Sequence, residues 1–570
     1  MRKRLLTMLV LLVAVVTGAW AQQPVTTYTV TMDDGKVDAD KWTVDPTTAT
    51  TDGVAEGTKV TLTYSGRRKV KSITATAGSA MLSTPLTLEA LTDGTIVVSN
   101  PQDGMQYSKN GGTKTAVTAD AISVVKGDKI AFYGKGTDIS SYFTINGDIL
   151  TNTSIAGGTA EVKAYGNIMS LVDETGFATN TKLTAEQAFL WLFGANTTLT
   201  DASELQLPAT TLTAECYESM FYGCTSLTTA PALPATTLTQ YCYSSMFNGC
   251  ASLTTAPELP ATTLAKSCYN DMFDGCTSLT TAPALPATTL AQSCYYKMFI
   301  GCTSLTTAPE LPATTLAQDC YSTMFYDCTS LTTAPALPVT TLTESCYAYM
   351  FQGCTSLTTA PALPATTLTK SCYSSMFQGC TSLTTAPELK ATTMEESCYK
   401  SMFQDCTKLA TAPELPATTL AQYCYYDMFN GCTSLTTAPA LPVTTLTGSC
   451  YKSMFQGCTS LTTAPALPAT TLTNSCYSSM FKGCTSLTTA PVLPATTLTG
   501  FCYQYMFDGC TSLTTVTCLA TDINASNCVL NWLKEVAATG TFYKAASMSN
   551  WQVDSPGGIP TGWTTQDYSE

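Results

Sequence analysis

Apolar residues recur along the chain with a fixed period of 26 residues from Cys216 to Cys510. In the first copy, Tyr217, Met220 and Phe221 lie at helical spacing, which predicts a short helix with one buried side. Twelve copies follow one another without insertion or deletion. A short fixed period is typical of solenoids, in which each unit packs only on its neighbours. The pattern therefore predicts an extended scaffold and not an active-site cleft.

The rest of each copy predicts a turn and a strand. Gly223 follows the expected helix, and its replacement by Asp327 and Asp405 in two copies fits a left-handed backbone position. Residues 227–230 are the best candidate for a parallel strand, and Pro231 ends it because proline cannot donate to a ladder. We therefore expect stacked coils with one helical side and one strand side.

Before the repeats, alternating apolar and polar residues predict β structure. Alternation at 28–32, 60–64 and 70–75 predicts a small β module. Short strands expected near 95–99, 121–125 and 129–133 suggest a β-sandwich-like domain. Whether these two regions bind carbohydrate or act as spacer or assembly modules stays open at this point.

Degenerate copies at both ends predict caps, which solenoids need to cover their open core faces. Residues 184–187 have capping-box spacing and predict a helix over 188–193. Cys528 still keeps the period, after which the pattern dissolves. We divide the chain into a signal peptide (1–21), a small β module (22–80), a β-sandwich-like domain (81–178), an N-terminal cap (179–212), twelve repeats (213–510) and a C-terminal cap (511–570).

The N-terminus has the pattern of a secretory signal. Basic residues at 2–4 precede an apolar run at 5–16, and residues 19–21 offer small side chains before Gln22. The run is shorter than the roughly 20 residues that span a bilayer, so a retained membrane anchor is the weaker interpretation. No cysteine precedes Cys216, so the sequence does not predict a lipoprotein. We expect a secreted or cell-surface protein, with no membrane insertion after cleavage.

Composition narrows the chemistry. The net charge of −14 and the lack of basic clusters disfavour nucleic acid and anionic membranes as partners. The chain has no histidine, which excludes Ser-His-Asp and Cys-His catalysis and any metal site that needs imidazole. No pair of acidic residues stands out for carboxylate catalysis. We therefore expect no enzyme activity, no cofactor and no metal.

The repeated Met-Phe-x-Gly-Cys-Thr-Ser-Leu-Thr, with its period of 26 after a signal peptide, resembles the BspA-like leucine-rich repeats of bacterial surface proteins. More narrowly, it resembles the 26-residue surface-protein repeat in its Bacteroidetes form, over roughly 184–533. The resemblance implies a right-handed solenoid that is exported and often acts as an adhesin. The expected fold is thus β-rich N-terminal modules followed by an α/β leucine-rich-repeat solenoid of about twelve 26-residue coils plus caps.

A second cysteine column, which begins at Cys216, departs from the common form and leaves two hypotheses open. One is a disulfide within each copy, which suits an exported chain but requires the helix to end early. The other is two ladders of buried free thiols, the second replacing the asparagine of other leucine-rich repeats, as Asn196 in the cap suggests. The candidate disulfides are Cys216–Cys224, Cys242–Cys250, Cys268–Cys276, Cys294–Cys302 and Cys518–Cys528.

Comparison of the copies separates fixed from variable columns. The variable positions fall on the expected helical side, whereas the strand side is a nearly uniform threonine surface. Threonine could recognise a periodic glycan there, or simply solvate a flat sheet. The candidate binding face consists of Tyr222, Tyr241, Tyr296, Ile300, Tyr326 and Tyr349.

Two classes of function remain. The first is a surface binding scaffold or adhesin for a host protein, a glycan or another cell. The second is a structural spacer without a ligand of its own, which the near-identity of the copies favours. A glycan-active enzyme is a distant third. The oligomeric state and the ligand do not follow from the sequence.

Overall fold

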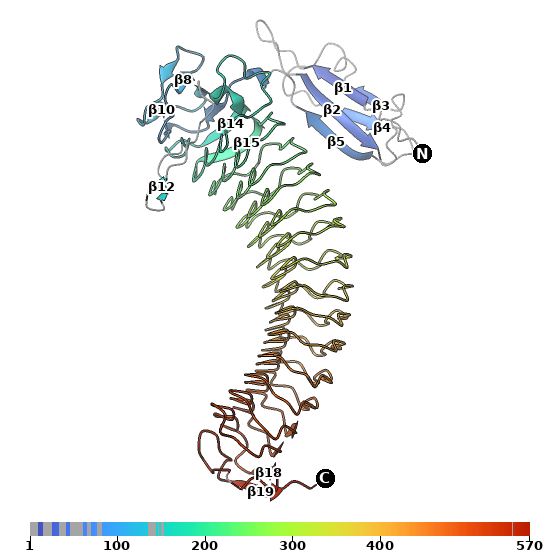
Figure 1. Cartoon of the computed structure of the whole chain (residues 1–570). Helices are drawn as coiled ribbons and strands as arrows, with labels where there is room; N and C mark the ends of the chain where they lie inside the picture. Colours follow the sequence, from blue (N-terminus) through green and yellow to red (C-terminus); the bar gives the residue numbers. More distant parts are fainter. Residues whose placement is uncertain are drawn as a thin grey trace. The chain divides into compact units, whose positions relative to one another are not determined.

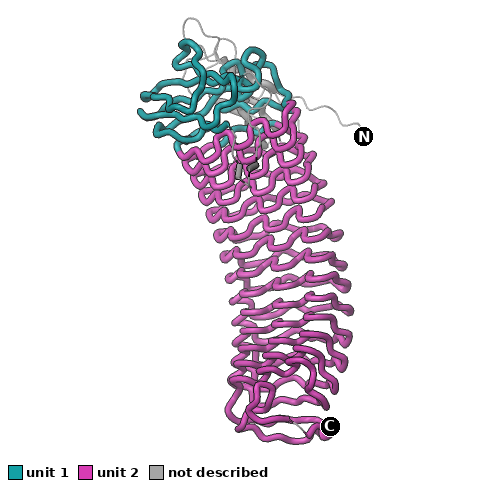
Figure 2. Tube along the Cα trace, turned by 60° about the vertical axis from the view of Figure 1, so that its left-hand side comes forward, with its two compact units in different colours: residues 1–183, 198–210, 230–234 teal, residues 184–197, 211–229, 235–570 magenta. Residues whose placement is uncertain are grey.

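The computed structural model describes residues 82–134, 153–549 and 551–569 in full, together with the backbone of seven further strands. The chain divides into two compact units (Figure 2), one of residues 1–183, 198–210 and 230–234, the other of residues 184–197, 211–229 and 235–570. The seven strands are β1 (Leu9–Ala14), β2 (Val25–Met32), β3 (Trp42–Asp45), β4 (Thr61–Tyr64), β5 (Val70–Thr76), β12 (Thr144–Ile145) and β13 (Asp148–Ile149).

The first strands form antiparallel β structure. Strand β2 pairs with β1 and β5, and β3 pairs with β4. The strands expected at 28–32, 60–64 and 70–75 are confirmed as β2, β4 and β5. Strand β1 lies inside the segment for which we expect a signal peptide, and export of the chain stays a prediction.

The second β region is a six-stranded sheet in the order β15-β14-β6-β11-β8-β9, with β7 and β10 paired separately (Figure 1). All neighbours are antiparallel except β14 and β15. Leu88, Ile130, Phe132 and Ala164 alternate with more exposed residues and form its core. The bounds are β6 (Thr87–Ala90), β7 (Gly94–Ile96), β8 (Gln106–Lys109), β9 (Thr115–Ala116), β10 (Ile122–Val124), β11 (Lys129–Tyr133), β14 (Val162–Asn167) and β15 (Leu199–Gln206).

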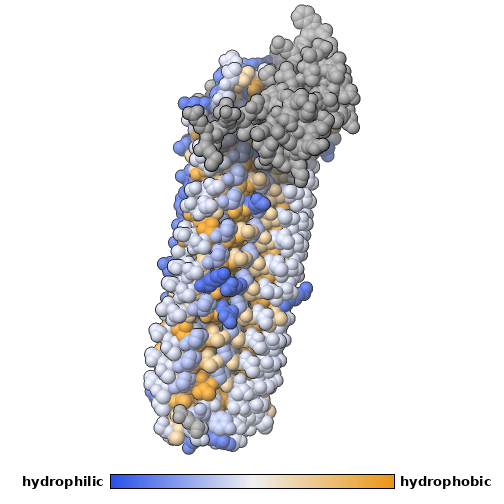
Figure 3. Space-filling view, turned by 90° about the vertical axis from the view of Figure 1, so that its right-hand side faces the viewer, coloured by the Kyte–Doolittle hydropathy of each residue, from blue (hydrophilic) through white to orange (hydrophobic). Residues whose placement is uncertain are grey.

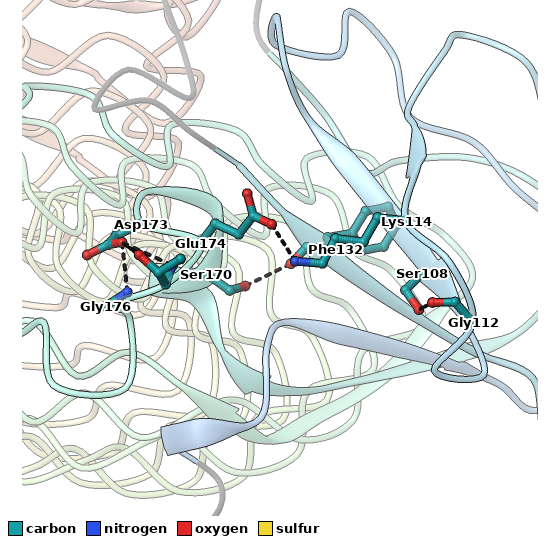
Figure 4. A network of polar contacts seen from close by, with 9 residues as sticks. Ser108, Gly112, Lys114, Phe132, Ser170, Asp173, Glu174 and Gly176 are labelled. Atoms are coloured by element: carbon teal, nitrogen blue, oxygen red, sulfur yellow. Dashed lines mark hydrogen bonds and ion pairs between the residues drawn. The ribbon is translucent and has the colours of Figure 1, made fainter.

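Buried side-chain hydrogen bonds join this sheet to the 3-10 helix Ile168–Leu171 (Figure 4). The Ser170 hydroxyl donates to the Phe132 carbonyl at 2.9 Å and accepts from the Leu86 N–H at 3.0 Å. Nearby, Lys114 forms an ion pair with Glu174 and its ammonium lies over the Tyr133 ring, 3.7 Å from the centroid. These contacts give the region a structural core.

In the solenoid, the side expected to be helical contains stacked turns instead. Odd-numbered backbone N–H groups donate to the next coil: Tyr217 N–H to Cys242 O at 3.0 Å, and Phe221 N–H to Met246 O at 2.9 Å. Even-numbered ones close turns within their own coil, as Met220 N–H does onto Tyr217 O at 3.3 Å. An α-helix would direct all of these groups to the fourth preceding carbonyl. The α/β assignment is therefore wrong, and the fold is β-rich with almost no helix.

Left-handed residues in every coil explain this difference. The angle φ is +58° at Glu215, +53° at Ser219 and +67° at Gly223, so every fourth residue reverses the local twist. Apolar residues between these reversals keep one buried side without forming a helix. The left-handed conformation expected at the glycine column is confirmed, including at Asp327 and Asp405, where φ is +55° and +58°.

The same turns continue past both ends of the twelve copies. Gln187 and Trp191 have φ of +59°, so the helix predicted over 188–193 is wrong as well. At the other end, Asn527 and Asn531 repeat the pattern, and parallel strands follow in the order β16-β17-β18-β19. Coil stacking therefore continues past Cys528, and the period of 26 residues is lost only between β18 and β19, where Gly540 pairs with Trp563. These strands are β16 (Thr489–Leu493), β17 (Thr515–Cys518), β18 (Gly540–Lys544) and β19 (Trp563–Asp567).

The strand side is reduced in most coils to single parallel bridges between threonines. Thr255 bridges to Thr281 and Thr333 to Thr359, at the position where we expected a strand. The parallel pairing is as expected, but the ladder stays short because a proline two residues later has no N–H to donate.

Columns of identical buried side chains fill the solenoid core. Stacked rings of the tyrosine column are 5.5–6.2 Å apart, and those of the phenylalanine column are 5.3–5.8 Å apart. Ring stacking therefore continues along both columns from coil to coil, and the stack of coils is curved (Figure 1).

Candidate binding surface

The invariant columns of each copy are internal. Tyr321, Met324, Phe325, Cys328 and Leu331 are at most 1% exposed, and so are their equivalents in nearly every copy. These residues build the coil and are not available to a ligand. A binding site on the solenoid must therefore use other columns.

The cysteine column that begins at Cys224 stabilises the backbone through its thiols. Cys354 Sγ donates to the Phe325 carbonyl at 3.0 Å, and Cys380 Sγ donates to the Phe351 carbonyl at 3.1 Å. All twelve copies repeat this bond to the phenylalanine of the preceding coil. Each of those carbonyls also accepts the N–H that closes its own turn, so the thiol satisfies its second lone pair.

All 26 cysteines are free and buried in the structure, so none of the five expected disulfides is formed. Burial raises the pKa of Cys216 and of Cys224, and the thiol one coil further along the same column raises it too: Cys242 for Cys216, and Cys250 for Cys224. The physical reason that the disulfides are not formed is that the thiols of the column that begins at Cys224 point at a carbonyl of the neighbouring coil and not at the Cys216 column. The unformed pairs are Cys216–Cys224, Cys242–Cys250, Cys268–Cys276, Cys294–Cys302 and Cys518–Cys528.

Burial also suppresses the reactivity of these thiols. It raises the pKa of Cys242 and of Cys250 to about 12, and the pKa of Cys276 well above its ordinary value. Since the thiolate is the reactive form, the columns have a structural and not a nucleophilic role.

We name the outer side of the stacked turns, formed by residues 215–223 and their equivalents, the turn face. All six residues of the expected binding face lie on it. Tyr349 is 39% exposed and Tyr222 is 37% exposed, whereas the other four are half-buried. Tyr222 stacks on Trp191, with ring centroids 4.7 Å apart, so part of its surface serves the N-terminal end of the solenoid.

The structure places four of these residues on three neighbouring coils. Ile300 and Tyr326 occupy the same column in neighbouring coils, as the bonds from Gly275 N–H to Ile300 O and from Gly301 N–H to Tyr326 O show. Tyr349 lies in the next coil, and Tyr296 lies in the coil of Ile300. Tyr222 and Tyr241 are in the first two copies, away from this group. We name Tyr296, Lys297, Ile300, Thr323, Tyr326 and Tyr349 the aromatic patch.

Three members of the aromatic patch occupy a left-handed column, which the sequence did not reveal. The column begins at Ser219, and eight of its twelve residues are serine or aspartate. Lys297, Thr323 and Tyr349 are consecutive in it, with φ of +59°, +60° and +59°. A bulky or β-branched residue is unfavourable there. The enrichment in serine and aspartate was the available signal for the conformation.

Carboxyl groups border the aromatic patch. Burial raises the pKa of Asp271 to about 6, and Asp274 raises it further, although Lys297 lowers it. The pKa of Asp274 is also raised by burial. This edge of the surface gains negative charge as the pH rises through 6.

A second cluster on the turn face was missed entirely. Lys400 and Lys452 lie over the Tyr426 ring from the coils before and after it, each 5.5 Å from the centroid. Tyr423 meets the same ring edge-on at 6.1 Å. No single copy contains this arrangement, because one column supplies residues from three coils.

Threonines of the opposite side hydrogen-bond to backbone carbonyls of the preceding coil. Thr332 Oγ1 donates to Thr306 O at 3.4 Å, and Thr355 Oγ1 donates to Thr329 O at 3.5 Å. Weakly polar residues also predominate on the face shown in Figure 3. The uniform threonines thus help to solvate and link the coils.

Within the described part of the chain, no group of three or more Cys, Asp or Glu residues is placed to hold a metal ion. The same residues include no helix of the length and apolarity needed to cross a membrane. Two hollows among the described residues lie away from the turn-face clusters. One of about 400 Å³ is lined by Lys534, Glu535 and Asp554, and one of about 480 Å³ by Pro468, Pro491 and Val492.

The fold defines a parallel repeat solenoid with stacked turns on one side and threonine bridges on the other. Residues 198–332, 270–410, 318–462 and 425–542 match the BspA type leucine-rich repeat region, and together they cover more than half of the chain. The chain belongs to this family, which confirms the resemblance read from the repeat. Repeats of this type are typical of surface proteins and are generally not enzymes.

No curated protein matches the chain. Among solved structures, a leucine-rich repeat protein from Bacteroides ovatus is 17% identical with a TM-score of 0.33, covering 67% of this chain and 93% of that one. The complex of TLR13 with ssRNA13 is 14% identical with a TM-score of 0.17, covering 53% of this chain and 48% of that one. Similarity at this level supports no functional argument.

Proposed function

We propose that this protein is an exported surface scaffold that binds a ligand through the turn face of its solenoid. The observation that carries the proposal is the placement of Lys297, Thr323 and Tyr349 at consecutive left-handed positions. A left-handed conformation destabilises an ordinary residue by about 1–2 kcal/mol, and a bulky or β-branched residue is the least favourable there. Most copies have the smaller serine or aspartate at this position. Departures from a local preference without a packing gain are typical of functional sites.

The same observation weighs against a spacer without a ligand. A spacer would need only the buried columns, and serine or aspartate would suffice at every left-handed position. The aromatic patch instead gathers three tyrosines and an isoleucine on three neighbouring coils, half-buried or exposed. Tyrosine is enriched in binding interfaces, where it supplies contact area with little loss of entropy.

The test uses the full chain on an array of collagen, laminin and purified glycans. The triple variant Ile300→Ser, Tyr326→Ser, Tyr349→Ser should lose binding at least tenfold, since tyrosine side chains often dominate interface energies. The control is Val125→Ser with Val553→Ser, which changes exposed apolar residues outside the turn face. Equal binding by both variants and the parent chain would contradict this site, and no binding by the parent chain would favour the spacer.

A further inference from the structure

The turn face changes its chemistry after the fifth copy. In the column that begins at Tyr222, five consecutive copies carry an amide, and no other consecutive copies in this column do. All five side chains are half-buried. We name them the amide row: Gln352, Gln378, Gln404, Asn430 and Gln456.

The backbone holds the amide row at a regular spacing. Gly353 N–H bonds to Gln378 O, and Gly379 N–H bonds to Gln404 O, each at 2.8 Å, so the column passes from coil to coil without a shift. The phenylalanine next to each amide stacks on its neighbour at 5.7–5.8 Å. This step is comparable to the length of one sugar unit along an extended β-linked polysaccharide.

The amides have hydrogen-bonding capacity to spare. Among the described residues, the side chains of Gln378 and Gln456 make no hydrogen bond, and the buried Gln352 Oε1 has no partner. Gln404 Nε2 reaches only Asp405 Oδ2, at 3.5 Å. Each amide offers donors and an acceptor side by side, which suits hydroxyl groups that also donate and accept.

Tyr423 and Tyr426 lie near Asn430, the member of the amide row in the ninth repeat. Lys400 and Lys452 each lie 5.5 Å from the centroid of the Tyr426 ring, so three neighbouring coils supply a hydroxyl and two ammonium groups as hydrogen-bond donors. Cation–π contact fixes these flexible side chains in advance. Asn430, in the row itself, donates to Asp427 at 3.0 Å, which joins the two groups.

We propose that the amide row, with Tyr423 and Tyr426, binds an extended neutral polysaccharide lying along the solenoid axis. The inference rests on the proposed function and names the ligand class for this part of the turn face. The chain carries a net charge of −14, which repels polyanions but not a neutral polymer. The row contains no apolar residue, whereas protein interfaces have an apolar core.

The experiment is affinity electrophoresis of the full chain in gels containing hydroxyethylcellulose, an extended neutral β-linked glucan. Dextran, a flexible neutral polymer, and alginate, a polyanion, serve as comparison gels. The variant is Gln378→Ala, Gln404→Ala, Gln456→Ala. Its matched control is Gln292→Ala, Gln318→Ala, Gln422→Ala, the same change at exposed glutamines of another column.

The parent chain and the control should be retarded by hydroxyethylcellulose, and the amide-row variant should bind about tenfold or more weakly, as expected for three lost hydrogen bonds. No retardation of the parent chain, or equal loss in both triple variants, would overturn the proposal. So would stronger retardation by alginate. Array binding that still depends on the aromatic patch would, in that case, leave the proposed function standing.

Discussion

Tyr349 combines an unfavourable backbone with an exposed ring. Its φ is +59° and its side chain is 39% exposed, so neither backbone preference nor core packing explains a tyrosine there. Asparagine and aspartate tolerate the left-handed conformation best among residues with side chains. Aspartate occupies this column in two other copies, and the small residue serine occupies it in six.

Replacing Tyr349 by asparagine should therefore stabilise the solenoid by about 0.5–1 kcal/mol while weakening ligand binding. The matched control is Tyr326→Asn, the same replacement in a column without positive φ, where only packing is lost. Urea unfolding followed by circular dichroism measures the stability of both variants. If Tyr349→Asn destabilises the chain as much as Tyr326→Asn does, strain is not the reason for the unusual residue.

At the scale of one coil, the structural element is a turn stack closed by a thiol. Cys354 donates to the Phe325 carbonyl, whose other partner is the Cys328 N–H. Cys354 and Phe325 are both buried, so water cannot reach the Phe325 carbonyl and replace the thiol as a hydrogen-bond donor if the thiol is removed.

Cys354→Ala should destabilise the chain by about 1–2 kcal/mol, through the lost hydrogen bond and the small cavity. Thr355→Ala is the control, because that hydroxyl also donates to a carbonyl of the preceding coil but is exposed to water. Its effect should stay below about 0.5 kcal/mol. Equal shifts of the two urea midpoints would show that the buried thiol bond has no special weight.

At the scale of the whole molecule, the thiols share one environment and respond to pH together. The folded-state pKa of Cys242, Cys250 and Cys294 is raised to about 12 by burial, whereas an unfolded thiol ionises near 8.5. Because the folded-state pKa is raised, the contribution of each buried thiol to the free energy of unfolding is fully present below a pH of about 8.5. It is lost as the pH rises toward 12, by about 1.4 kcal/mol per pH unit for each thiol.

The solenoid should therefore unfold cooperatively on raising the pH above about 9, far below the pKa of its buried thiols. Circular dichroism and thiolate absorbance at 240 nm, recorded together, measure this. Both signals should change at the same pH. Thiolate absorbance that appears near pH 8.5 with unchanged circular dichroism would mean that the cysteines are not buried.

The repeat could be read from the sequence because identical residues must stack when every coil packs on its neighbour. The period, the buried columns and the left-handed glycine position with Asp327 and Asp405 all followed from that. The helix prediction was wrong because Tyr217, Met220 and Phe221 have the same apolar spacing in a helix and in a chain of alternating turns. The left-handed residues at Glu215 and Ser219 decided between the two, and neither is a glycine.

The candidate site was predicted in part. Variable columns could be assigned to one face, which the structure confirms by placing Tyr326 and Tyr349 on it. Which variable residues lie together depends on the register between coils. Lys400, Tyr426 and Lys452 follow one another at intervals of 26 residues in the chain and meet at the Tyr426 ring.

By itself, the sequence determined the period, the core columns, the lack of imidazole chemistry and the family. Only the tertiary structure decided that the thiols bond to phenylalanine carbonyls and that the coils are turns and not helices. It also decided which variable residues share a surface. The physical reason is that hydrogen bonds and contacts between coils join residues one period apart, and no local pattern within a coil specifies which groups meet there.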